Sequence, residues 1–565
     1  MLGAMRVADF TYLALFFTSL LVVTVPLGRW MAAVLRGEPP SWLRWLAPAE
    51  RLLYRLGGVQ SGQEMSWCSY ALAVVMFNLV GGALVLALQL AQAHLPLNPQ
   101  GFGPVPFGVA VNTAVSFLTN TNWQAYAGEA SLSYLTQMAG LGVQNFLSAA
   151  TGLAVMAALA RGFSRKSAAS LGNFWTDLVR STLYLLLPLS FVFAVVLVAQ
   201  GVVQSFAPYP VATTLAGTEQ VIPVGPAASQ IAIKQLGTNG GGFFGLNSAH
   251  PFENPTPFSN FLQLLAILAL PAGCVHAYGL LVGAGRHAWV VYGVMLAFFV
   301  ATLGLSLWSE YATLGSAALA LEGKEVRFGV TPSVLWAGAT TAASNGSVNA
   351  MHSSLSPLAG GLVLFNMLLG EIVFGGIGSG LYGMVMVIIL AVFLAGLMVG
   401  RTPEYLGKKI EAFEIRMAAV AVLLPCAGVL LGSAISFASE AGRGAVGNAG
   451  PHALSEILYA WGSMANNNGS AFGSLTATGD LYTWGGSLAM LLGRFGVIIP
   501  VLALAGRLAG KKTVPASSGT FPTDGPLFAV LLAGVILIVA ALTYFPALTL
   551  GPVLEHLLLT AGRTF

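Results

Sequence analysis

Four short polar turns, each set between apolar segments, constrain this chain more than any other feature of its sequence. Each turn follows a long apolar run and a shorter apolar segment, and each precedes another long apolar run. The turns are Thr119-Asn120-Thr121-Asn122, Thr238-Asn239-Gly240-Gly241, Ser344-Asn345-Gly346-Ser347 and Asn467-Asn468-Gly469-Ser470. Written as columns, the second position is Asn every time and the third is Thr, Gly, Gly and Gly. The pattern predicts four copies of one helix–short helix–turn–helix unit.

The long apolar runs predict helices that span a membrane. The chain has 565 residues, of which 56% are hydrophobic and only 8% charged, whereas soluble chains carry about a quarter charged residues. A spanning helix needs about 20 mostly apolar residues. We take the first run as a retained helix, because it lacks a convincing cleavage site for a signal peptide. The predicted spans are 10–28, 67–93, 139–160, 181–203, 258–283, 288–308, 358–400, 417–438, 485–506 and 526–550.

The shorter apolar segments are too short to cross the bilayer, and each runs into one of the turns. They cover 106–118, 229–236, 332–343 and 453–465. The distances from the start of each first helix to its turn are similar, at 52, 57, 56 and 50 residues. We therefore predict an all-α polytopic membrane protein with ten transmembrane helices and pseudo-fourfold repeats with re-entrant loops. The expected division is 1–66 for an N-terminal helix and cytoplasmic segment, 67–180, 181–286, 287–415 and 416–512 for the repeats, and 513–565 for a C-terminal helix.

The distribution of basic residues predicts the orientation. Seventeen of the 24 Lys and Arg residues fall on one side of the predicted membrane and five on the other. Cytoplasmic loops carry the excess of Lys and Arg, so both termini and the four short segments are expected to face outward from a cytoplasmic membrane. The two remaining basic residues, Lys234 and Arg494, fall inside membrane segments.

The turns have the properties of a site for a dehydrated monovalent cation. Non-helical backbone at membrane depth must be hidden within protein or line a cavity, and four such turns can meet at one axis. A helix that enters from outside points its partially negative C-terminal end inward. Gly, Ser and Thr leave backbone carbonyls accessible for a cation, and the Asn at each second position can brace the loop. The alternative is four ordinary outer loops, because the same residues are common in turns; Asn345 and Asn468 also match the glycosylation sequon.

The turns and their flanks resemble those of a known family. The motifs that carry the resemblance are Thr119–Gln124, Gly237–Phe244, His250–Pro255, Ser344–Asn349 and Asn466–Phe472. They resemble the superfamily of potassium transporters with four fused helix–pore-helix–helix units and, within it, the KdpA family, the potassium-translocating subunits of the bacterial Kdp ATPase. The resemblance implies K⁺ as the transported ion, no organic cofactor, and three partners: the P-type ATPase subunit KdpB, the periplasmic subunit KdpC and the small membrane peptide KdpF. Because the channel filter Thr-Val-Gly-Tyr-Gly is absent and Thr121 replaces the third-position Gly in repeat I, we expect few ion sites with asymmetric walls.

Ionisable residues within the apolar runs are candidates for a gate. The run 358–400 would extend about 64 Å as one helix, twice the hydrocarbon thickness of about 30 Å, so it must break, and we place the break at 370–380. We predict that this break is a cytoplasmic-side gate containing Gly370 and Gly376, and that Glu371 faces Arg494 with Gln124 nearby. The resemblance implies that such groups border a tunnel to the pump subunit, whereas the alternative is a buried structural ion pair.

Lys234 needs a separate explanation, because it lies four residues before the second turn. A cation there opposes cation binding unless it is neutralised or directed away, so we expect a structural or gating role.

The sequence assigns no chemistry to the chain itself. It contains no Gly-x-x-x-x-Gly-Lys-Ser/Thr and no Asp-Lys-Thr-Gly of P-type pumps. We therefore expect a non-catalytic, potassium-binding subunit of an ATP-driven uptake complex. The first alternative is a stand-alone transporter of the Trk/Ktr kind. A polytopic membrane enzyme would need a pocket of catalytic residues, and a pure assembly scaffold would leave the four turns unexplained.

Overall fold

A computed structural model describes residues 5–313, 321–400, 403–515 and 520–563 of the chain. Within these residues, ten helical segments are long and apolar enough to span a membrane. This confirms the predicted all-α fold with ten spans. Strands occur in the described residues only as two small antiparallel hairpins, β1–β2 (Val211–Thr213 and Glu219–Val221) and β3–β4 (Glu404–Tyr405 and Lys408–Lys409).

The helices follow the order of the four predicted repeats. The chain begins with α1 (Val7–Arg36), η1 (Ser41–Leu46) and α2 (Ala47–Leu56). Repeat I contains α3 (Trp67–Ala91), η2 (Gln92–His94), the short α4 (Phe107–Leu118), α5 (Gly128–Ser131), η3 (Thr136–Gly142) and α6 (Val143–Ser164). Repeat II contains α7 (Phe174–Ser181), η4 (Thr182–Leu186), α8 (Leu187–Ala199), the short α9 (Ala227–Leu236), η5 (Asn247–Ala249) and α10 (Pro257–Val282).

The second half of the chain has the same plan. Repeat III contains α11 (Gly285–Thr313), the short α13 (Val330–Ala342), η6 (His352–Ser354), α14 (Pro357–Leu368) and α15 (Ser379–Val399). Repeat IV contains α16 (Ala412–Ala438), α17 (Glu440–Arg443), the short α18 (Gly450–Ala465), η7 (Leu481–Gly485) and α19 (Gly486–Ala509). The chain ends with α20 (Pro526–Leu548), η8 (Thr549–Val553) and α21 (Leu554–Thr560).

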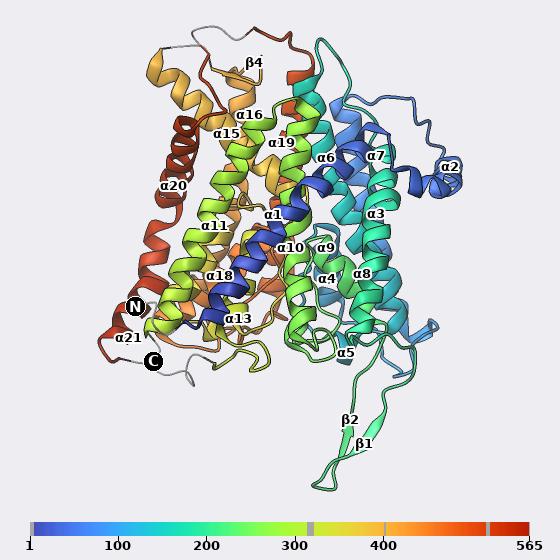
Figure 1. The fold of residues 1–565 in the computed structure, drawn as a ribbon. Coiled ribbons are helices and arrows are strands. Elements are labelled where there is room, and N and C mark those ends of the chain that lie inside the picture. Colours follow the sequence, from blue (N-terminus) through green and yellow to red (C-terminus); the bar gives the residue numbers. More distant parts are fainter. Residues whose placement is uncertain (1–4, 314–320, 401–402, 516–519, 564–565) are drawn as a thin grey trace.

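The second spanning helix of each repeat forms the interior of the bundle. The apolar stretches of α6, α10, α15 and α19 are 83, 72, 67 and 61% buried, whereas the other spans are 17–50% buried. Figure 1 shows the short helices α4, α9, α13 and α18 in the half of the bundle nearest the β1–β2 hairpin. The start of α1 and the end of α21 lie at that same end, and α2 and β3–β4 lie at the opposite end (Figure 1).

One predicted span starts too late. The stretch predicted at 181–203 is helical from Phe174 to Ala199, with a π-helical turn inside it. The first turns are polar, but their polar groups have partners. Asn173 caps the helix by accepting from the backbone of Trp175 and Thr176. Asp177 accepts two hydrogen bonds from Arg161, at 2.5 and 2.7 Å. Hydropathy alone could not predict that the helix begins in this polar segment, because it does not show that the polar groups have hydrogen-bond partners.

Candidate cation site formed by four re-entrant turns

The four short helices, which we call the pore helices, end in the interior of the protein. Every residue of α9 except Ser229 is buried, and α13 is buried from Ser333 to Ala342. All four helices end on a residue with similar backbone angles: φ and ψ are −90° and 1° at Thr119, −80° and 0° at Gly237, −89° and 2° at Ala343, and −103° and 17° at Asn466. The turns that follow therefore start from equivalent positions.

This equivalence corrects the register predicted for repeat I. The backbone amide of Thr121 donates to the carbonyl five residues before it, as do those of Asn239, Asn345 and Asn468. Thr121 therefore occupies the position of these Asn residues, and the prediction of Asn at one shared position in all four turns is wrong. Asn122, with φ 53°, takes the place of Gly240, Gly346 and Gly469, whose φ values are 83°, 88° and 101°. The prediction aligned the four turns on Asn120. The residue at which each pore helix ends sets the true alignment of the turns.

The turns touch one another in cyclic order. A Cβ atom added to Gly240 would lie 1.7 Å from the carbonyl oxygen of Asn345 in the next repeat. At Gly346 it would lie 2.1 Å from the carbonyl oxygen of Asn468, and at Gly469 it would lie 2.1 Å from that of Thr121. The side chain of Asn120 closes the circle by donating to the carbonyl of Thr238 at 3.0 Å. We call this arrangement the ring.

The ring excludes the alternative of four ordinary outer loops. Thr119–Asn122, Thr238–Gly241 and Ser344–Ser347 are buried throughout, and in the fourth turn only Gly469 is partly exposed. Both sequon asparagines, Asn345 and Asn468, are fully buried at 0% exposure. Four C-terminal helix ends meet here, and each contributes a partial negative charge.

Asparagine side chains brace two of the turns from behind, as predicted. Asn345 donates to the carbonyl of Lys234 at 3.1 Å and accepts from the backbone of Ser347 at 3.0 Å. Asn468 makes the equivalent bonds to Thr340, at 2.9 Å, and from Ser470, at 3.0 Å. The bonds that Asn345 and Asn468 donate cross to the preceding repeat, so the turns hold one another in place.

The brace in the second turn differs from this prediction. Asn239 donates to two side chains instead of a backbone carbonyl: Asn120, at 2.5 Å, and Ser148, at 3.1 Å. The first and second turns are therefore joined through Ser148 of α6, and the ring has unequal walls.

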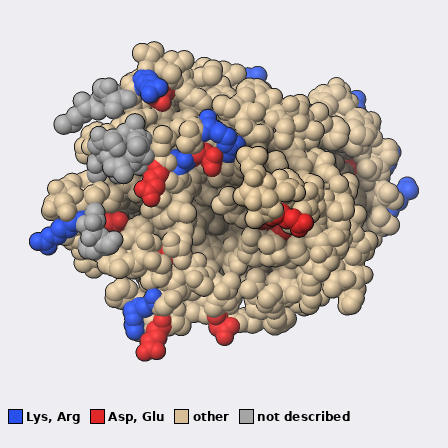
Figure 2. Space-filling model, turned by 90° about the horizontal axis from the view of Figure 1, so that it is seen from below, with Lys and Arg blue, Asp and Glu red and all other residues tan. Residues whose placement is uncertain are grey.

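Gln124 lies on the side of the ring nearest α5 and the β1–β2 hairpin, which we call the outer side, so the prediction that it accompanies Glu371 is wrong. Its side chain accepts from the backbone N–H of Gly242 at 2.8 Å and donates to the Gly242 carbonyl at 3.0 Å. Gln124 and Glu129 line a cavity of about 500 Å³ that reaches Gly469. Figure 2 shows the molecule from this side, with a hollow near the centre of the face and both acidic and basic side chains near it. We call this cavity the outer vestibule.

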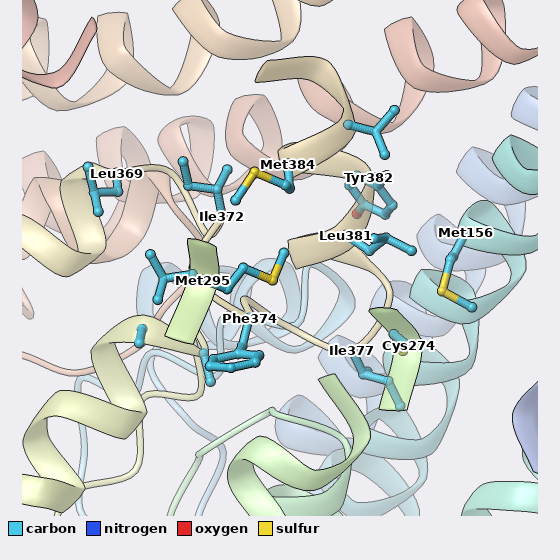
Figure 3. Packing of buried hydrophobic residues seen from close by; sticks show 14 of the residues in the cluster. Met156, Cys274, Met295, Leu369, Ile372, Phe374, Ile377, Leu381, Tyr382 and Met384 are labelled. Carbon is cyan, nitrogen blue, oxygen red and sulfur yellow. The ribbon is translucent and has the colours of Figure 1, made fainter. Parts of the chain in front are cut away.

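The second helix of repeat III is broken where predicted. The segment 369–378 separates α14 from α15 and contains left-handed residues at Gly370, Glu371, Phe374, Gly375 and Gly378. Its apolar side chains pack into the surrounding helices together with Met295 and Cys274 (Figure 3). A left-handed residue with a side chain costs about 1–3 kcal/mol, so the protein maintains this break at an energetic cost.

The broken segment lies directly under the ring. The backbone amide of Ile377 donates to the Thr238 hydroxyl at 2.8 Å, and that of Gly375 donates to the Ala342 carbonyl at 3.2 Å. A Cβ atom on Gly378 would lie 2.2 Å from the carbonyl oxygen of Gly152 on α6. The segment therefore reaches from repeat III across to repeats I and II. At Gly376, an added Cβ would lie 3.6 Å from the Glu371 carboxylate.

Glu371 belongs to this segment, and Arg494 lies beside it. The charge of Arg494 acts on Glu371, but among the described residues no direct ion pair joins them. Arg494 is 4% exposed and donates to the Ser148 carbonyl at 2.8 Å. The Ser148 hydroxyl lies 2.7 Å from the Asn120 side-chain oxygen. Arg494 is thus connected to the first and second turns through Ser148, a residue to which the sequence pattern assigned no role.

The charge of Lys234 is neutralised inside the protein. It forms an ion pair with Glu253, and both side chains are 0% exposed. His250, three residues before Glu253, adds no charge at neutral pH because burial lowers the pKa of its imidazole below the usual range. His250 stacks on Phe244 with ring centroids 4.0 Å apart. The His250–Pro255 motif thus supplies the counter-charge for Lys234, a role that its sequence did not reveal.

Two aromatic side chains also support the ring and were missed. Trp336 donates from its indole nitrogen to the Ser347 carbonyl at 2.9 Å. Tyr459 lies 2.9 Å from the Ser470 hydroxyl and 2.7 Å from His352. Trp336 and Tyr459 stand the same number of residues before Ser344 and Asn467, so their spacing was a usable signal.

The fold and the ring define a membrane protein of the four-repeat transporter class, with a pore helix and a re-entrant turn in each repeat. A solved structure with the same fold is the potassium transporter TrkH from Vibrio parahaemolyticus, with a TM-score of 0.53 and 15% sequence identity over 78% of this chain and 85% of that one. The chain belongs to the KdpA family, described as the potassium-transporting ATPase A subunit, which matches residues 14–557.

Curated relatives match nearly the whole chain. The potassium-transporting ATPase potassium-binding subunit of Sorangium cellulosum (strain So ce56) is 59% identical over 97% of this chain and 98% of its own length. The subunit of the same name from Herpetosiphon aurantiacus is 55% identical, with the same coverage of both chains. The relative from Pseudomonas fluorescens (strain SBW25) is 54% identical.

Proposed function

We propose that this chain binds K⁺ at the ring of four turns and passes it on as the potassium-binding subunit of an ATP-driven uptake complex in a bacterial cytoplasmic membrane. In this proposal a separate P-type subunit, KdpB, hydrolyses ATP. The other partners of the chain are KdpC, KdpF and membrane lipid. Both termini face outward. The observation that carries this proposal is the closed ring, in which backbones from four repeats approach too closely for a side chain at Gly240, Gly346 or Gly469.

The ring residues supply what a dehydrated K⁺ needs. Backbone carbonyls and hydroxyls replace water ligands, and four pore-helix C-termini favour positive charge at the centre. In this proposal the filter consists of Thr119–Asn122, Thr238–Gly241, Ser344–Ser347 and Asn467–Ser470. The Asn122 side chain takes the place where the other repeats have Gly, which supports unequal walls and few ion sites.

The segment 369–378 is the gate in this proposal. It crosses the cytoplasmic side of the ring, with Gly370, Glu371 and Gly376 in it and Arg494 beside it. An apolar cavity of about 70 Å³ extends sideways from Gly370 and Asn466 to Tyr544 on α20. An ion blocked below the ring could leave along this direction toward the ATPase subunit. The cavity supports a lateral path more than a straight one to the cytoplasm.

Ion-dependent stability of the purified protein tests the proposal. A ligand at 100 times its Kd stabilises the folded state by about 2.7 kcal/mol, so saturating K⁺ should raise the thermal unfolding midpoint. Rb⁺ should act similarly, and Na⁺ at equal ionic strength should have little effect. Equal shifts with all three ions would contradict a potassium site.

Purification in detergent distinguishes the main alternative. A stand-alone Trk/Ktr-type transporter would purify without an ATPase. When this chain is expressed together with the proposed partner subunits, a P-type subunit should purify with it. Loss of that subunit under conditions that preserve the fold would favour the alternative.

The outer vestibule predicts an electrostatic effect on K⁺ capture. Glu129 lines this cavity and accepts from the backbone of Gly245 at 2.7 Å, a bond that Gln can also accept. We expect Glu129→Gln to raise the K⁺ concentration for half-maximal ATPase stimulation about 2–3-fold at low ionic strength, because surface charge attracts cations within a Debye length of about 10 Å at 0.1 M salt. Added choline chloride should remove the difference. Glu219→Gln, on the exposed β2 strand, is the matched control and should change nothing at either ionic strength.

A further inference from the structure

The buried Lys234–Glu253 pair is connected to the ring through one side chain. The Lys234 ammonium donates to the side-chain oxygen of Asn247 at 2.8 Å. The side-chain nitrogen of Asn247 donates to the carbonyl of Gly240 at 2.8 Å. A fixed positive charge therefore stands one amide away from a carbonyl of the second turn. Glu253 also accepts from the backbone of Phe244 at 2.9 Å, just beyond that turn.

We propose that Lys234, Glu253 and Asn247 form a charge-compensated anchor that sets the affinity of the second turn for the cation. The inference rests on the proposed function of the ring as the K⁺ site. Within it, Lys234 and Glu253 are positioning residues that act through Asn247 and through their net charge.

The orientation of the Asn247 amide follows from hydrogen-bond chemistry. An ammonium group only donates, so it must face the amide oxygen, and the NH₂ group of Asn247 must then face Gly240. Lys234 thereby determines which way the amide points. The Lys234 backbone is fixed as well, because its carbonyl accepts from the amides of Asn239 and Gly240 at 2.8 and 3.1 Å. The brace from Asn345 ends on the same carbonyl.

Stability alone does not explain the pair. A buried ion pair is often no more stable than well-packed apolar residues of similar volume. Its position does provide an explanation, because charges interact strongly over several ångströms where water is excluded. An uncompensated ammonium behind the second turn would repel the transported ion, and Glu253 cancels that repulsion. Affinity should therefore depend on the balance between the two charges.

The two single neutralisations should have unequal effects on the assembled complex. Glu253→Gln keeps an acceptor for Phe244 but leaves the ammonium uncompensated. We expect it to raise the K⁺ concentration for half-maximal ATPase stimulation on the order of ten-fold. Lys234→Met removes the positive charge, so no repulsion of K⁺ remains, but it also removes the donor that orients Asn247. We therefore expect it to raise the half-saturating K⁺ concentration less than Glu253→Gln does, by no more than the loss of the Asn247 link alone. A purely structural pair would behave differently, since both changes break the same ion pair and would weaken binding alike.

A matched control is a second fully buried pair among the described residues, Lys324 with Glu310, at 2.8 Å and 0% exposure for both side chains. Glu310→Gln should lower the unfolding midpoint without changing the half-saturating K⁺ concentration. A third variant, Asn247→Ala, keeps both charges and removes only the link to Gly240. We expect it to raise the half-saturating K⁺ concentration about five-fold, corresponding to about 1 kcal/mol.

Each outcome decides the inference. Weakening of K⁺ binding by Glu253→Gln and Asn247→Ala, with a smaller effect of Lys234→Met than of Glu253→Gln, supports it. Equal weakening of K⁺ binding by Glu253→Gln and Lys234→Met overturns it, and so does an unchanged K⁺ affinity in Asn247→Ala. If the two charge variants do not assemble, the result for Asn247→Ala decides alone. Absence of K⁺ binding by the wild-type complex would instead overturn the proposed function itself.

Discussion

Replacing Gly346 with Ser should abolish high-affinity K⁺ binding. Gly346 has φ 88°, a left-handed conformation that costs an L-residue about 1–2 kcal/mol. The larger effect is steric, because its Cβ would lie 2.1 Å from the carbonyl oxygen of Asn468 and 3.1 Å from the Cα of Gly469. Both contacts are backbone and cannot rotate away, so the third and fourth turns must separate. We expect the half-saturating K⁺ concentration to rise at least ~100-fold, the equivalent of about 2.8 kcal/mol.

The measurement is K⁺-stimulated ATPase activity of the assembled complex, accompanied by Rb⁺ binding at equilibrium. Gly240→Asp should behave in the same way, since its Cβ position lies 1.7 Å from the Asn345 carbonyl oxygen. Gly338→Ala is the matched control: it lies in pore helix α13, and its Cβ would make ordinary contacts with the side chains of Phe299, at 3.6 Å, and Leu303, at 3.8 Å. Normal affinity in both ring variants, with an assembled complex, would show that K⁺ does not bind at the ring.

Selectivity should change with the same substitutions. A ring that has been forced open can no longer hold its oxygens at the spacing of a dehydrated K⁺, and selectivity depends on the size of the oxygen cage and on the number and field strength of its carbonyls. Na⁺ should therefore stimulate the Gly346→Ser complex nearly as well as K⁺ does.

The spans, pore helices and helix break could be predicted from the sequence because each depends on local physics. Hydropathy over about 20 residues identifies a span, and the apolar run 358–400 was too long to be one helix. Its glycines indicated where it must break, and α14 and α15 end and begin on either side of them. The pore helices were found within a few residues of their ends because apolar segments too short to span, followed by polar turns, leave few alternatives.

The finer errors arose where tertiary contacts determine the position of a residue. The first turn was aligned on Asn120, but the backbone hydrogen bonds place Thr121 at the position equivalent to Asn239, Asn345 and Asn468. Only the residue at which α4 ends shows this. Gln124 was placed near Glu371 although it binds Gly242 on the outer side. Nothing local relates Lys234 to Glu253, which lies nineteen residues further along the chain. Contacts of this kind depend on how the loop after the turn folds back, which periodicity and hydropathy do not encode.

Removing the buried charge of Arg494 should uncouple the ring from the pump. Arg494→Met keeps the length and apolar stem of the side chain but removes the hydrogen bond to the Ser148 carbonyl. Hydrogen bonds to charged groups contribute about 1.5–3 kcal/mol, so we expect K⁺-stimulated ATPase activity to fall at least ~10-fold. A positive charge under the ring also opposes passage straight to the cytoplasm. Its loss should allow K⁺ flux without ATP in reconstituted vesicles.

The choice of controls separates this role from simple destabilisation. Arg507→Met changes an exposed arginine on the same helix α19 and should leave both ATPase activity and flux unchanged. Arg494→Lys retains the charge but lacks the planar, multi-donor guanidinium, so it should suppress the leak while restoring only part of the ATPase activity. If Arg494 were purely structural, its loss would lower the unfolding midpoint without opening an ATP-independent path. Unchanged K⁺-stimulated activity in Arg494→Met would mean that the gate does not depend on this charge, because no other Arg or Lys among the described residues donates to Ser148.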